Sequence, residues 1–173
     1  MSSIDIEEGD LRFTFAAGWE AQKYDDWVFY KSQFQKVCHL CNGIKGVDIV
    51  AHNDGTAWFV EVKDYRRNPR SKKVGLVDEV AKKVFDTLAG LVAAKNRAND
   101  ASEKAMASAM LACRNIRVVL HLEQASRGSK LFPKIYDPAD LKKGLKIQLK
   151  AIDPHPEVLD KATTNPTTHW RVV

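Results

Sequence analysis

A predicted β-hairpin in the segment 46–65 constrains the fold of this chain more than any other stretch of its sequence. Two apolar-rich runs flank Asp54-Gly55, the kind of dipeptide that forms the loop of a two-residue type I′ turn. This turn fixes the register of the two strands, and it places Asp48 opposite Glu61. Because side chains alternate between the faces of a strand, we predict that one face is continuously apolar. That face comprises Val47, Ile49, Ala51, Trp58, Val60 and Val62.

The second face of the hairpin carries Asp48, Glu61 and Lys63 beside Val50 and Phe59. Like charges directly opposite each other destabilise a sheet, so the two carboxylates need a compensating partner. A divalent cation between them would supply it, and Mg²⁺ is commonly held by one or two carboxylates together with waters and phosphates. We therefore predict a metal site with Lys63 beside it. The alternative is an ordinary hairpin with a solvated, charged face.

The arrangement of Asp48 on one strand and Glu61-Val62-Lys63 on the next resembles the core of the PD-(D/E)xK nuclease superfamily, which includes restriction enzymes and repair nucleases. The resemblance implies catalytic roles for Asp48, Glu61 and Lys63. The two carboxylates would bind Mg²⁺, with Mn²⁺ as a substitute, and the backbone carbonyl of Val62 would add a ligand. Lys63 would orient the water that attacks a phosphodiester bond.

Members of this superfamily often add an acidic ligand from an N-terminal helix. Glu20 is the candidate for that ligand if its segment is helical, and Asp25 or Asp26 takes its place if the segment is extended. His121, on a predicted strand, is a secondary candidate for the site.

The excess of positive charge is concentrated directly after the predicted catalytic strand. The chain has 27 basic and 22 acidic residues, a net charge of +5, and five basic residues fall within eight positions. These residues are Arg66, Arg67, Arg70, Lys72 and Lys73. Clustered lysines and arginines bind phosphate backbones, so we predict contact with nucleic acid, DNA rather than RNA. The alternative is a solvated charge run at the end of a strand.

The remaining pattern predicts a single α/β domain over residues 1–173 with a mixed central sheet flanked by helices. The resemblance implies that this domain is restriction-endonuclease-like. We expect the acidic residues 1–10 to be frayed at their start. We expect strands at 11–15, 19–24, 116–123 and 170–173, and helices from 76 to about 98, from 100 towards 113, and from 138. The first of these helices is expected to cover Val47, Ile49, Val60 and Val62.

The cysteine content and the hydropathy of the sequence indicate the compartment of the protein and argue against a zinc site. The three cysteines are an odd number, which suits a reducing compartment, and Cys38-His39-Leu40-Cys41 lacks the second ligand pair of a zinc site. No apolar run approaches the length of a membrane span, and the first residues do not resemble a signal peptide. We therefore expect a cytoplasmic protein without a membrane partner.

The sequence thus predicts a Mg²⁺-dependent endonuclease, and it leaves open a homodimer. Two alternatives remain: a nucleic-acid-binding module of the same fold without catalytic activity, and a protein-interaction domain that uses Trp19 and Trp27.

Overall fold

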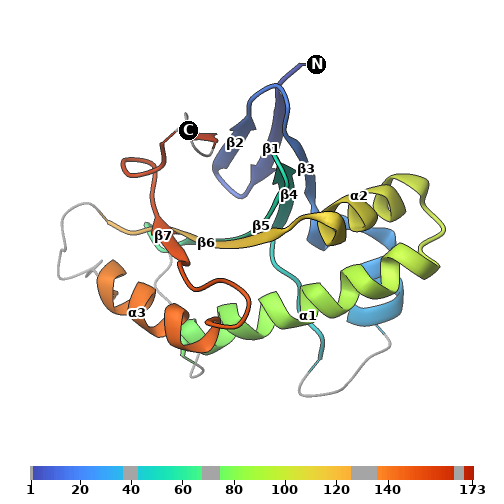
Figure 1. Ribbon diagram of the computed structural model, residues 1–173. Helices are drawn as coiled ribbons and strands as arrows, with labels where there is room; N and C mark the ends of the chain where they lie inside the picture. Colours follow the sequence, from blue (N-terminus) through green and yellow to red (C-terminus); the bar gives the residue numbers. More distant parts are fainter. Residues whose placement is uncertain (1, 37–42, 68–74, 126–135, 166–169) are drawn as a thin grey trace.

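A five-stranded mixed sheet forms the centre of the computed structural model, which describes residues 2–36, 43–67, 75–125, 136–165 and 170–173 (Figure 1). In spatial order its strands are β3 (Glu20–Lys23), β4 (Ile49–Asn53), β5 (Thr56–Asp64), β6 (Asn115–Glu123) and β7 (Glu157–Leu159). The pairs β3–β4 and β4–β5 are antiparallel, whereas the pairs β5–β6 and β6–β7 are parallel. The predicted mixed sheet and α/β class are confirmed.

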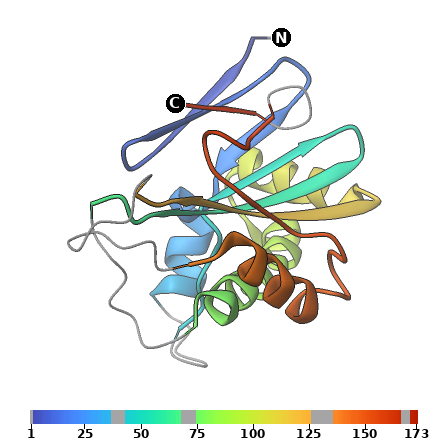
Figure 2. The same ribbon diagram turned by 90° about the vertical axis from the view of Figure 1, so that its left-hand side faces the viewer.

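A second, smaller sheet covers one face of the central sheet (Figures 1 and 2). In spatial order it comprises β1 (Ile4–Glu8), β2 (Leu11–Phe15) and β8 (Arg171–Val172). Strand β1 was not predicted: fraying was expected at the start of residues 1–10, whereas Ile6 pairs with Phe13 and is buried. The charged residues that suggested fraying suit an edge strand, because charge on an exposed edge discourages pairing with other chains.

Helices cover the opposite face of the central sheet (Figure 1). They are α1 (Leu76–Arg97), α2 (Ala101–Ala112) and α3 (Pro138–Gln148), preceded in the chain by a 3₁₀ turn, η1 (Tyr24–Asp26), and a π-helical turn, η2 (Tyr30–Gln35). The predicted helix starts are confirmed: Asp100 accepts hydrogen bonds from two backbone N–H groups of α2, and Asp137 caps α3. Among the described residues, none of the helices combines the length and apolar character needed to cross a membrane.

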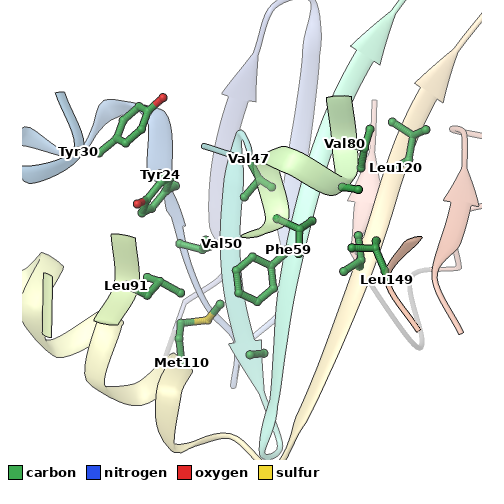
Figure 3. Packing of buried hydrophobic residues seen from close by; sticks show 14 of the residues in the cluster. Tyr24, Tyr30, Val47, Val50, Phe59, Val80, Leu91, Met110, Leu120 and Leu149 are labelled. Atoms are coloured by element: carbon green, nitrogen blue, oxygen red, sulfur yellow. The ribbon is translucent and has the colours of Figure 1, made fainter. Parts of the chain in front are cut away.

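The hairpin turn and register agree with the prediction, but the elements that cover its two faces do not. Asp54 and Gly55 have φ values of +47° and +70°, as a type I′ turn requires, and Ile49 pairs with Val60. The face with Ile49 and Val60 packs against the small sheet. Helix α1 instead packs on the face that carries Phe59 and the charged residues (Figure 3). Both faces are buried, so apolar character alone did not identify the face that binds the helix.

Aromatic rings fill the space between the two sheets. The ring centroid of Trp58 lies 5.8 Å from those of both Trp19 and Trp170, and the last two are 5.9 Å apart. Phe15 also packs on Trp19 and Trp170. The small sheet is therefore held to the central sheet by a continuous cluster of large apolar rings.

Gly90 allows α1 to approach the ring of Tyr24, which Figure 3 shows beside Leu91. A Cβ atom at Gly90 would lie 2.0 Å from the Tyr24 hydroxyl oxygen. Tyr24 is 1% exposed and packs against Trp27 and Tyr30, so it has little room to move. This close approach explains a glycine in the middle of a long helix.

Candidate charged site beneath helix α1

A cluster of five charged side chains lies between the hairpin and α1. The hairpin contributes Asp48, Glu61 and Lys63, and α1 contributes Glu79 and Lys83. The Nζ atom of Lys83 lies 2.7 Å and 2.8 Å from the two Glu61 carboxylate oxygens and 3.3 Å from Asp48 Oδ1. Lys63 pairs with Glu61, and its Nζ is 3.5 Å from Glu79 Oε1. The structure thus brings together the three residues predicted from the hairpin and adds two more.

The Lys83 ammonium group lies between the two carboxylates for which the sequence predicted a cation. This role was not predicted, because Glu79, Lys83 and Thr87 of α1 were not among the candidate site residues. In the structure Glu79 and Thr87 are buried, and the Thr87 hydroxyl oxygen accepts a hydrogen bond from the Val47 N–H at 3.0 Å. The sequence did contain a signal for this placement: Glu79, Lys83 and Thr87 are four residues apart, which puts them on one side of the helix.

Burial controls the charge state of this cluster. Glu61 is fully buried, and burial together with the nearby Asp48 carboxylate raises its pKa to about 7, against the opposing effect of the two lysines. Burial alone would lower the pKa of Lys83, but the Glu61 and Asp48 carboxylates outweigh it and hold that pKa above its usual value. Burial alone would also lower the pKa of Lys63, but the attraction of the nearby carboxylates, Glu61 above all, outweighs this effect and raises that pKa. Both ammonium groups therefore stay charged at neutral pH.

A second acidic group adjoins this cluster through Asp48. One carboxylate oxygen from each of Glu8, Asp25 and Asp48 lies within 4.8 Å of the others. Asp25 Oδ1 is buried and has no hydrogen-bond partner among the described residues, and burial followed by the charge of Glu8 raises the pKa of Asp25 to about 6. Glu20, the first candidate for a further ligand, lies on β3, where its carboxylate is 3.3 Å from His52. Because the segment around Glu20 is extended, Asp25 is one of the two residues predicted to take the place of Glu20 as a ligand. The structure places Asp25 near Asp48.

These contacts distinguish two places where a divalent cation could bind. Between Asp48 and Glu61, both Glu61 oxygens already contact lysines, and Asp48 Oδ2 accepts a hydrogen bond from the Val62 N–H at 2.6 Å. The group of Glu8, Asp25 and Asp48 offers three oxygens, the ligand type that Mg²⁺ prefers. Glu8 pairs with Lys23 at 2.8 Å, but Asp25 supplies an oxygen without a hydrogen-bond partner among the described residues. The donor set of this group therefore fits Mg²⁺ better than the Asp48–Glu61 pair does.

His121, the secondary candidate, lies away from the charged cluster. Its ring is fully buried against Phe13 between the two sheets, with Nε2 3.0 Å from a Glu123 oxygen. These contacts indicate a structural role for His121.

The basic loop after β5 is partly neutralised by nearby acids. Arg66 pairs with Asp64 at 2.6 Å, and Arg67 pairs with Asp10 at 3.1 Å. The other three predicted phosphate-binding residues, Arg70, Lys72 and Lys73, lie outside the described residues, as do Cys38 and Cys41.

Helix α3 and the turn after it carry a basic surface that was not among the predicted nucleic-acid-binding residues. Lys142, Lys143, Lys146 and Lys150 are exposed, and none of them forms an ion pair with another described residue. Lys142 and Lys146 are four positions apart beside the buried stripe of α3, so they share one side of the helix, and Lys150 lies in the turn after it. The spacing of these lysines is visible in the sequence, but they were not among the predicted binding residues.

Comparison with known proteins identifies a relative of a different kind from a nuclease. The chain is 36% identical over 166 residues to a cysteine–tRNA ligase of Neisseria meningitidis serogroup A / serotype 4A (strain DSM 15465 / Z2491). The match covers 80% of this chain and 24% of the ligase, so the chain spans about a quarter of its relative's length. No family model and no solved structure matches the chain.

This similarity overturns the nuclease interpretation. The relative is named as a ligase, so the predicted membership of the PD-(D/E)xK superfamily and the predicted Mg²⁺-dependent endonuclease activity on DNA are wrong. The comparison gives no support to DNA as the partner or to a homodimer. The prediction had depended on a short pattern, Asp48 with Glu61-Val62-Lys63, whose opposed carboxylates are accounted for by Lys83.

Proposed function

We propose that this chain is a tRNA-binding module that serves aminoacyl-tRNA synthesis. The observation that carries this proposal is the 36% identity to part of a cysteine–tRNA ligase, which extends over 80% of the chain. Because most of the chain matches, the similarity concerns the fold as a whole and not a short motif.

Electrostatics supports a nucleic-acid partner. The net charge is +5, and the described lysines of α3 project their ammonium groups without neutralising partners among the described residues. Lysines in such an arrangement bind phosphates and release counterions, which gives an affinity that falls steeply with salt. The lysine surface of α3, defined as Lys142, Lys143, Lys146 and Lys150, is therefore the proposed contact with the tRNA backbone.

Mg²⁺ is the proposed ion of this module. Glu8, Asp25 and Asp48 would hold it. The ion would keep several waters and accept phosphate oxygens of the RNA as further ligands. Lys63 and Lys83 would remain paired with Glu61 and keep the carboxylates in place. Mn²⁺ would substitute for Mg²⁺ because it prefers the same oxygen ligands.

Fluorescence anisotropy with a labelled cysteine tRNA transcript tests the proposal. We expect salt-dependent binding that is at least tenfold tighter than binding of duplex DNA with a similar number of phosphates. A double variant, Lys142→Glu with Lys146→Glu, should weaken binding strongly and reduce the salt dependence, because two phosphate contacts become repulsive.

The matched control is Lys95→Glu with Lys104→Glu, which makes the same change in net charge at two exposed lysines of α1 and α2. A wild-type protein that does not bind tRNA, or that binds DNA equally well, would refute the proposal. Equal losses in the two double variants would refute the assignment to α3.

Binding of Mn²⁺, followed by electron paramagnetic resonance, tests the ion site separately. Asp25→Asn should abolish binding, whereas Asp26→Asn should leave it unchanged, because Asp26 is an exposed neighbour already paired with Lys31 at 2.7 Å. Equal Mn²⁺ affinity in the two variants would show that Asp25 is not a ligand.

A further inference from the structure

A basic pocket lies at the start of β5 and β6, at the opposite end of β5 from Glu61. Its volume is about 350 Å³. Thr56 and Trp58 from β5, Arg114 and Arg117 from the start of β6, and His155 from the segment after α3 are among its lining residues. Figure 2 shows these three parts of the chain on the same side of the molecule, at the right of the view.

Arg117 is held in a fixed orientation at this pocket. Its guanidinium carbon lies 5.7 Å from the centroid of the Trp58 ring. One terminal nitrogen donates to the Glu157 carboxylate at 2.6 Å and to the His155 carbonyl oxygen at 2.9 Å. The side chain is nevertheless 31% exposed. A planar cation stacked on an indole and fixed by two hydrogen bonds is prepared to receive a flat, electron-rich ring on its exposed side.

Asp153, the acidic residue of the pocket, pairs with Arg117, whose Nε lies 3.6 Å from Asp153 Oδ2. Asp153 is 1% exposed, and its two oxygens accept hydrogen bonds from the backbone N–H groups of Val118 and His155, both at 2.8 Å. Arg114 is exposed, and its side chain forms no ion pair with another described residue. The accessible chemistry of the pocket is therefore cationic and aromatic.

A short stretch of chain joins the lysine surface of α3 to the pocket. It runs from Lys146 in the last turn of α3 through Lys150 to Ile152 and His155, which line the pocket. The lysines that directly precede the pocket in the chain are candidates for contact with the phosphates of neighbouring nucleotides.

We propose that this pocket binds one unpaired nucleotide of RNA, with the base on the Arg117 guanidinium and the adjoining phosphate at Arg114. Single-stranded RNA is recognised by stacking of splayed bases on aromatic side chains or guanidinium planes, together with phosphate contacts. The pocket volume lies near the lower end of the roughly 300–1,000 Å³ range of small-ligand sites, which suits a single nucleotide. This inference rests on the proposed function, because it assigns the part of the RNA that the module recognises.

Anisotropy with a fluorescein-labelled hexa-adenylate RNA tests the pocket. Arg117→Lys keeps the charge and removes the stacking plane, and it should weaken binding by about five- to 150-fold, the range for loss of one stacked base. Arg114→Ala removes an exposed guanidinium and should weaken binding by several-fold with a smaller salt dependence. Lys104→Ala removes an exposed charge on α2 and should leave the affinity unchanged.

Thermal unfolding of each variant establishes that it is folded, and Arg114→Ala tests the pocket even if Arg117→Lys proves unstable. Adenosine 5′-monophosphate serves as a second probe and should bind at least tenfold more weakly than hexa-adenylate, because it lacks the neighbouring phosphates. Equal binding of the two probes would overturn the assignment to RNA. Wild-type binding of tRNA with hexa-adenylate affinity unchanged in both arginine variants would overturn the pocket and leave the proposed function standing. Absence of tRNA binding by the wild type would overturn both.

Discussion

Replacing Lys83 with methionine should destabilise the protein more at pH 8.5 than at pH 5.5. The Lys83 ammonium group contacts both oxygens of Glu61, which is fully buried, and methionine removes the charge while filling a similar space. At pH 5.5 the buried carboxyl can bind a proton and lose its need for a cation. At pH 8.5 protonation is unfavourable, so the folded state must hold either a poorly compensated charge or a proton taken from a basic solution.

The size of the difference follows from the pKa of Glu61. In the wild type this pKa is about 7 against an ordinary value of 4.5, which at pH 8.5 corresponds to about 3.4 kcal/mol of lost stability. Without Lys83 the carboxyl remains protonated to a higher pH, and the loss at pH 8.5 approaches about 5.4 kcal/mol, four pH units above 4.5. The Glu61 contribution to the destabilisation by Lys83→Met is therefore about 2 kcal/mol at pH 8.5 and close to zero at pH 5.5.

Urea unfolding followed by far-ultraviolet circular dichroism measures both values. Lys82→Met is the matched control, because Lys82 lies next in the helix, is one-third exposed and pairs with Asp86. Its loss should cost about 0–1 kcal/mol at either pH, as for an ordinary surface ion pair. A destabilisation by Lys83→Met that is equal at the two pH values, or no larger than that of Lys82→Met, would refute the assigned role of Lys83.

Three further predictions concern the hairpin and the helices. Stability should fall as pH rises from about 4.5 to about 7, because folding raises the pKa of Glu61 and the unfolded chain therefore releases this proton first. Glu61→Gln should flatten this part of a plot of unfolding free energy against pH. Gly90→Ala should lower stability by about 1–3 kcal/mol in urea unfolding, although alanine has the better helix propensity. Adding Tyr24→Phe should restore most of this loss, because it removes the oxygen that would lie 2.0 Å from the new Cβ. Additive effects of the two substitutions would contradict the proposed clash. Asp100→Ala should lower the thermal midpoint by an amount equivalent to about 1 kcal/mol, and an unchanged midpoint would show that the cap does not stabilise α2.

Local signals in the sequence were sufficient for the secondary structure around the site. The Asp54-Gly55 turn fixed the hairpin register, and with it the neighbourhood of Asp48 and Glu61. Capping residues at Asp100 and Asp137 located the starts of two helices. These features depend on contacts a few residues apart, where residue type and backbone geometry are directly linked.

Features that depend on packing between distant segments could not be predicted in the same way. The hairpin is apolar on both faces, so its sequence did not reveal which face α1 covers. The long apolar stem of Lys83 lies alongside the core, and its ammonium group reaches Glu61, although a helical pattern places lysine outside. Asp25 approaches Asp48 only because the short strand β3 ends next to the hairpin. Function was misassigned for the same reason: a pattern of opposed carboxylates does not show which cation compensates them.

The cluster of Trp19, Trp58 and Trp170 gives this protein built-in optical probes of how its two sheets come apart. The chain has four tryptophans, and the fourth, Trp27, packs among the helices on the other face of the central sheet. Indole rings with centroids 5.8–5.9 Å apart are close enough for excited-state coupling, so the near-ultraviolet circular dichroism of the three is sensitive to separation of the small sheet. A variant that keeps Trp27 alone would report on the helical side by fluorescence. Coincident transitions of the two signals would show that both layers unfold as one cooperative unit, and separated transitions would show that the small sheet detaches first or last.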